Sequence, residues 1–192
     1  MTSTTVDHLS HHARPRARRD RLLRGPHPYL PPLFVFVVLR HERRELLHFN
    51  VTDHPTAAWT ARQLVEAFPD DTAPTYLLRD RDRVHGDEFV RRVQAMQIRE
   101  VRIAPRAPWQ NPFVERVIGS IRRECLDHVL VLNERHRRRL FGAYVAYLNR
   151  SRPHQALENN HPIPREVQPP SHGPIRAVPE VGGLHHRYQR VA

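Results

Sequence analysis

A carboxylate, a guanidinium and an aromatic, amide-rich loop lie close together between residues 107 and 126. Glu115 and Arg122 are seven residues apart, so on a helix they share one face, two turns from each other. The loop Pro-Trp-Gln-Asn at 108–111 comes directly before them. These residue types together could form a site for phosphate chemistry. The structural alternative is an exposed Glu and Arg on the solvated face of an amphipathic helix.

Local signals predict the helix that would position these side chains. Asn111 is a favourable N-cap, and Pro112 suits the first helical position. Apolar residues then recur at helical spacing, which predicts one buried stripe. The stripe consists of Val114, Val117, Ile118, Ile121 and Cys125.

The chain resembles the catalytic core of insertion-sequence transposases and retroviral-type integrases, the DDE superfamily, from about residue 33 to about 170. The resemblance rests on four phrases that occur in the family's order and at its spacing. They are TYLLRDRD at 75–82, PWQN at 108–111 leading to Glu115-Arg116, RRECL at 122–126 and YLNRSRPHQAL at 147–157.

The resemblance implies roles for individual residues. Asp80 and Glu115, with 34 residues between them, correspond to two of the family's three acids that bind Mg2+ or Mn2+. Asp80 is preferred over Asp82 because sites gather at the carboxyl ends of strands. The implied DNA contacts are Arg106, Trp109, Gln110, Asn111, Arg116, Arg122 and Arg123.

The fold class that the resemblance implies is α/β, an RNase H-like mixed sheet flanked by helices. Apolar patterns predict strands at 33–39, 45–51, 76–78 and 98–103, and helices at 56–68, 87–96 and 134–150. The continuous apolar run at 33–39 is typical of a strand buried on both faces. In the helix 56–68, Trp59, Leu64 and Val65 are expected to face the core.

The segment 1–32 lacks the pattern of a folded element. It is rich in His, Arg and Pro, and the family's first, central strand with its first catalytic Asp is not recognisable there. We therefore expect that strand to be missing or degraded. Either the segment is a disordered basic arm or it is read out of frame. Asp20 or Asp53 could replace the missing acid, although Asp53 is more simply a helix cap or loop residue.

The predicted domain organisation has three parts: a basic arm at 1–32, an integrase catalytic core at 33–158 and a Pro-rich C-terminal tail at 159–192. Within the tail, residues 182–188 could form a short hairpin or a segment that touches DNA. The basic run at 135–139 could contact phosphates or form a solvated helix face.

Composition restricts the partners. The 192 residues carry a formal net charge of +11, and because the sequence contains no Lys, all 31 basic residues are Arg. Such a charge favours DNA as the partner, with a basic solubilising surface as the alternative. One Cys excludes an internal disulfide framework. We expect no membrane association, a cytoplasmic, nucleoid-associated location, and assembly with itself or with an intact transposase.

Three functional hypotheses remain at this point. The first is a transposase or integrase catalytic domain, impaired by loss of the first Asp. The second is a catalytically inactive DNA-binding remnant. The third is a product that does not fold, because an absent central strand leaves exposed sheet edges.

Overall fold

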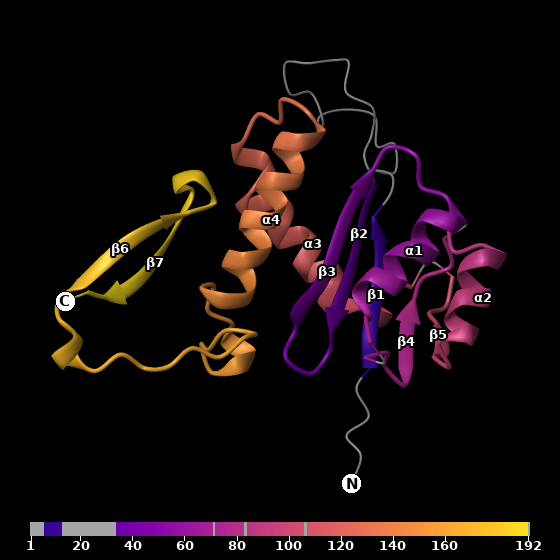
Figure 1. The fold of residues 1–192 in the computed structure, drawn as a ribbon, viewed down its shortest axis with the longest axis horizontal. Helices are drawn as coiled ribbons and strands as arrows, with labels where there is room; N and C mark the ends of the chain where they lie inside the picture. Colours follow the sequence, from indigo (N-terminus) through magenta and orange to yellow (C-terminus); the bar gives the residue numbers. More distant parts are fainter. Residues whose placement is uncertain (1–5, 13–33, 71, 83, 106, 192) are drawn as a thin grey trace, which may run out of the picture. The chain divides into compact units, whose positions relative to one another are not determined.

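The computed structural model describes residues 6–12, 34–70, 72–82, 84–105 and 107–191, and residues 6–12 by their backbone alone (Figure 1). The chain divides into two compact units, Met1–Ile118 and Gly119–Ala192, and each is described by itself. Helix α3 (Pro112–Glu124) spans the boundary between them.

The first unit contains a mixed sheet of five strands in the order β3-β2-β1-β4-β5. β1 pairs antiparallel with β2 and parallel with β4, and β4 pairs parallel with β5. The predicted α/β class with a mixed sheet is therefore confirmed. The strands are β1 (Val6–His12), β2 (Phe34–Arg40), β3 (Glu45–Thr52), β4 (Tyr76–Arg79) and β5 (Arg99–Arg102).

The expectation that the first strand is missing is corrected, because β1 occupies the centre of the sheet. Its backbone forms a ladder with β2 from Asp7↔Arg40 to His12↔Val35. On its other side the ladder with β4 ends at Leu9↔Arg79. A strand position is defined by main-chain hydrogen bonds on both sides, so a polar, His-rich segment can fill it. The predicted boundaries at 32/33 and 158/159 stay predictions.

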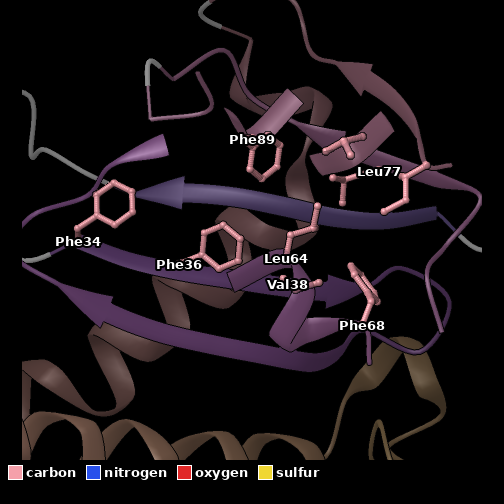
Figure 2. Close-up of a cluster of buried hydrophobic side chains, with 9 residues drawn as sticks. Phe34, Phe36, Val38, Leu64, Phe68, Leu77 and Phe89 are labelled. Carbon is pink, nitrogen blue, oxygen red and sulfur yellow. The ribbon is translucent and has the colours of Figure 1, made fainter. Parts of the chain in front are cut away.

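The core of the first unit lies between the sheet and two helices, α1 (Ala57–Ala67) and α2 (Asp87–Ala95). Side chains from β2, α1, β4 and α2 meet in one apolar cluster, shown in Figure 2. Val37 and Leu39, which alternate with the cluster residues of β2, are also buried. The prediction that this strand is buried on both faces is therefore confirmed. The cluster consists of Phe34, Phe36, Val38, Leu64, Phe68, Leu77, Phe89, Val93 and Ile98.

Helix α1 is capped by Thr56, whose hydroxyl accepts a hydrogen bond from the Trp59 backbone N–H at 3.1 Å. Leu64 is buried and Trp59 packs against the cluster, as predicted. The prediction for Val65 is wrong, because its side chain is 42% exposed. Gln63 takes a buried position instead, where its side-chain oxygen accepts a hydrogen bond from Asn50 of β3 at 2.7 Å.

The second unit is built around α4 (Glu134–Arg150) and a two-stranded hairpin of β6 (Ile175–Glu180) and β7 (His185–Arg190). Asn133 caps α4, because its side-chain oxygen accepts from the His136 backbone N–H at 2.8 Å. Among the described residues, no helix combines the length and apolar character that a membrane span requires.

A charged network joins the end of α3 to the end of α4. The Glu124 carboxylate accepts two hydrogen bonds from the Arg152 guanidinium, at 2.7 and 2.8 Å, and one from the Tyr144 hydroxyl at 2.8 Å. Burial alone would raise the pKa of Glu124, but the hydrogen bonds from Arg152 and Tyr144 outweigh it and hold the pKa below its ordinary value. Two of the sequence motifs therefore meet in one structural network.

The apolar cluster predicts that substitutions at two adjacent positions of α1 change the free energy of unfolding by very different amounts. Leu64→Ala removes a fully buried side chain and should lower the free energy of unfolding by about 2–5 kcal/mol. Val65→Ala, at an exposed position, should change it by less than about 1 kcal/mol. Chemical denaturation of both variants measures the difference, and equal effects would contradict the assignment of the core.

The Glu124 network predicts a pH-dependent contribution to stability. Glu124→Gln should lower the free energy of unfolding at pH 7 by about 1–3 kcal/mol, because two charge-assisted hydrogen bonds are weakened. The folded-state pKa is depressed, so this contribution is present above the unfolded-state pKa and disappears as the pH falls through the folded value.

The matched control is Glu134→Gln, which breaks an exposed pair with Arg138. It should cost less than about 0.5 kcal/mol. Denaturation curves at pH 7 and in acid provide the measurement. A Glu124→Gln deficit that is equally large in strong acid would show that the carboxylate charge is not responsible.

Candidate active site

The main chain at Asp80 is fixed on both sides. Arg79, at the end of β4, is buried, forms an ion pair with Glu100 of β5 and donates to the Asp80 carbonyl oxygen at 2.7 Å. Arg81 donates through Nε to the Ile103 carbonyl oxygen at 2.9 Å. Asp80 is therefore held at the carboxyl end of a strand, as predicted from the sequence.

The Asp80 carboxylate is partly buried and sits in a short polar turn. Its Oδ1 accepts a hydrogen bond from the Asp82 backbone N–H at 3.1 Å and lies 3.4 Å from Nδ1 of His85. The Asp82 carboxylate accepts from the Val84 backbone N–H at 3.2 Å. Asp82 thus closes the turn locally and does not share the position of Asp80.

His85 is a site residue that sequence reasoning missed. Its side chain is inaccessible to solvent, and its ring lies 4.6 Å from the Phe89 ring, between centroids. The signal available in the sequence is its position five residues after Asp80, across a turn. A buried imidazole beside a carboxylate restricts the orientation of that carboxylate, so His85 helps to position Asp80.

The loop before α3 is anchored through its amide residues. Gln110, in the 3-10 helix Pro108–Gln110, accepts a hydrogen bond from the Ala104 backbone N–H at 2.7 Å. Asn111 is only 2% exposed, and its carbonyl oxygen accepts from the Glu115 backbone N–H at 3.3 Å. Trp109, in contrast, is 73% exposed. Of these predicted DNA contacts, Trp109 offers surface, whereas Asn111 supports the start of α3.

The first turn of α3 packs on the connection between β2 and β3. The Phe113 ring lies 4.5 Å from the His41 ring and 4.5 Å from the Arg44 guanidinium. Burial and the nearby charge of Arg116 both lower the pKa of Arg44, and burial and Arg44 lower the pKa of His41. The Arg44 and Arg116 guanidinium groups are therefore close enough to repel each other, and a bound anion would relieve that repulsion. Arg44 is a second residue that sequence reasoning missed.

The two candidate acids have separate anchors. The first turn of α3, which carries Glu115, packs on the β2–β3 connection. That connection follows Arg40, which pairs with Asp7 near the start of β1. Asp80 instead follows β4, one position beyond the pair Leu9↔Arg79. Glu115 is half-buried in the first turn of α3. The convergence of Asp80 and Glu115 on one pair of metal ions stays a prediction.

The candidates for a third acid can be placed by register. The residue after Leu9 on β1 is Ser10, and Asp7 lies three positions earlier, about 10 Å along the strand. Asp53 follows β3, at the sheet edge, and its carboxylate lies 2.7 Å from Nδ1 of His54. β3 is three strand positions from β4, about 14 Å. Asp20 lies outside the described residues.

The remaining predicted contacts are Arg106, Arg122 and Arg123. Arg122 and Arg123 belong to the second unit, and Arg122 lies 3.8 Å from the Asp127 carboxylate. Arg106 is outside the described residues. Within the part of the chain that the structure describes, no three His, Cys, Asp or Glu side chains gather in a way that could hold a metal ion.

A family model described as an integrase core domain matches residues 96–162, which include Glu115, α3 and α4. No curated protein matches the sequence. The catalytic core domain of BIV integrase has a similar fold, with a TM-score of 0.56 and 12% identity over 83% of this chain and 91% of that chain.

Two further solved structures are similar. The intasome of simian T-cell lymphotropic virus, in complex with PP2A regulatory subunit B56 gamma, matches with a TM-score of 0.60 and 13% identity over 96% of this chain and 66% of that chain. The HTLV-2 integrase catalytic core domain in complex with magnesium matches with a TM-score of 0.51 and 12% identity over 77% and 86%. Residues 96–162 are thus similar in sequence to an integrase core domain, and the chain has the RNase H-like fold of these integrase catalytic cores.

Proposed function

We propose that the chain acts on DNA as a transposase/integrase-type core whose capacity for phosphodiester hydrolysis and strand transfer is impaired. The observation that carries the proposal is the position of Asp80. Asp80 follows β4, which lies next to β1, the central strand of an RNase H-like sheet. By the register of β1 and β4, the residue of β1 at the level of Asp80 is Ser10, which is not an acid.

A fit test on the metal site supports impairment. In-line phosphoryl displacement uses two divalent ions about 3.5–4 Å apart, which must be held by several carboxylate oxygens. The similar HTLV-2 core was solved with magnesium. The donor set that the sequence predicts is Asp80 and Glu115, and among the described residues no three potential metal ligands gather. Two acids alone would supply too few carboxylate oxygens for two ions, which favours impairment.

DNA binding does not depend on that centre. Arg44, Arg116 and the exposed Trp109 offer cations and an aromatic surface around the start of α3. Electrostatic attraction to phosphates supplies much of the affinity of such surfaces. The second candidate function, a catalytically inactive DNA-binding remnant, is favoured by the same residues.

Assembly and location belong to the same proposal. The HTLV-2 core was solved in dimeric and trimeric forms, and the simian virus protein within an intasome. We propose that this chain likewise associates with itself or with an intact transposase, on DNA in the cytoplasm.

The incomplete donor set predicts very weak catalysis. With Mn2+ and supercoiled plasmid, the full chain should nick DNA at a background rate that Asp80→Asn and Glu115→Gln leave unchanged. Gel electrophoresis of the plasmid gives the rate. Metal-dependent nicking that Asp80→Asn abolishes would show that the site is active.

A gain-of-ligand variant separates an incomplete site from a misfolded one. Ser10→Asp adds a carboxylate at the level of Asp80, so Mn2+ should raise its unfolding temperature more than that of the natural chain. Adding Asp80→Asn should remove the gain. No Mn2+ effect in Ser10→Asp would contradict the register argument.

The cationic surface at the start of α3 predicts a salt-dependent interaction with DNA. Arg44→Gln and Arg116→Gln should each weaken duplex binding and reduce the slope of log K against log salt by about 0.9 if each neutralises one phosphate. Arg62→Gln is the matched control, since Arg62 is an exposed residue of α1. Fluorescence anisotropy at several salt concentrations tests this, and equal slopes for all three variants would refute the assignment.

A further inference from the structure

A cleft of about 450 Å3 opens in the second unit, between the segment 158–168 and the open end of the β6–β7 hairpin. The volume is within the range of small-ligand sites. Its lining combines two guanidinium groups, an aromatic ring and several amides. The residues that matter for its chemistry are Asn159, Asn160, Arg165, Tyr188, Gln189 and Arg190.

The cleft has a fixed frame. Arg190 donates its backbone N–H to the Gln168 side-chain oxygen at 2.7 Å and its Nη1 to the Gly173 carbonyl oxygen at 2.9 Å. On the other side, His154 and Asn160 form a β-bridge around a tight turn in which Glu158 and Asn159 both have positive φ. These contacts hold both walls, one through Gln168 and Arg190 and the other through the β-bridge, and Asn159 lies on an exposed turn.

Tyr188 is on the hairpin face that does not pack on α4. The opposite face carries Glu180 and His185, which hydrogen bond to Ser151 and to the Glu124 carbonyl oxygen. Alternation along the strand places Tyr188, paired with Ala177, on the other face, and its ring is 62% exposed. In the part of the chain that the structure describes, no other ring stacks on Tyr188, so its exposed ring offers a stacking surface in the cleft.

The charges select a class of ligand. Among the described residues no carboxylate forms an ion pair with Arg165. Burial is the main cause that lowers the pKa of His161, and the nearby charge of Arg165 is the second cause. Glu158 and Glu166 also line the cleft, so it does not suit a compact polyanion. Amides, an aromatic ring and a cation together suit a ligand with a flat face, hydrogen-bonding edges and spaced phosphates.

We propose that this cleft binds unpaired nucleotides of single-stranded DNA, with a base stacked on Tyr188 and a phosphate at Arg165. The inference deepens the proposed function and rests on DNA being the partner. In a duplex the base faces are stacked on one another and cannot reach the ring, so the cleft should distinguish single strands from duplex.

The test compares a labelled 12-nucleotide oligo(dT) with a duplex, using the full chain and fluorescence anisotropy. Tyr188→Ala should weaken oligo(dT) binding about tenfold and duplex binding less than twofold, whereas Tyr188→Phe, which keeps the ring, should bind like the natural chain. Arg165→Gln should weaken oligo(dT) binding about fivefold. Arg176→Gln, on the same hairpin but outside the lining, is the matched control.

The outcomes are separable. If the natural chain does not bind oligo(dT), or if Tyr188→Ala and Arg165→Gln bind it as well as Arg176→Gln does, the proposal is overturned. Equal losses for oligo(dT) and duplex would also overturn it. Duplex binding that is insensitive to Arg44→Gln and Arg116→Gln would instead count against the proposed function. Circular dichroism verifies folding, and Arg165→Gln, in an exposed loop, provides the answer if Tyr188→Ala does not fold.

Discussion

The structure of the first unit depends on the main-chain ladders on either side of β1. β1 pairs with β2 on one side and with β4 on the other, so these ladders join the β2–β3 hairpin to the parallel pair β4–β5. Without them, both halves would expose an unpaired edge. The position of Asp80 depends on the same ladders, because Asp80 directly follows β4. The segment Val6–His12, whose composition does not predict a strand, therefore determines both the fold of this unit and the position of Asp80.

Local signals predicted most elements correctly because their residues satisfy local rules. The apolar run of β2, for example, forms a strand buried on both faces. β1 was missed because its place is decided by hydrogen bonds to distant strands, which no composition rule reports. The error at Val65 has a similar cause, since buried Gln63 is selected by its bond to Asn50 of β3.

The candidate site was predictable only in part, because a sequence motif does not show which of its residues act in the reaction and which stabilise the fold. Glu124, in the motif at 122–126, accepts hydrogen bonds from Arg152, in the motif at 147–157, and from Tyr144. Asn111 is buried beneath the start of α3. Residues that the motifs do not mark, His85 and Arg44, contact Asp80 and Phe113 through the folded chain. Three-dimensional contacts of this kind are invisible to spacing along the sequence.

The polar residues around Asp80 stabilise the fold, and this role is independent of catalysis. Arg79 is buried, so removing its partner Glu100 would leave an uncompensated buried charge, which is strongly destabilising. The same guanidinium holds the Asp80 carbonyl and lies 5.7 Å from the Phe89 ring of the apolar cluster. The strand end that presents Asp80 is thus part of the stability of the sheet. A chain that loses one acid of the site would keep the rest of this geometry, because the fold requires it.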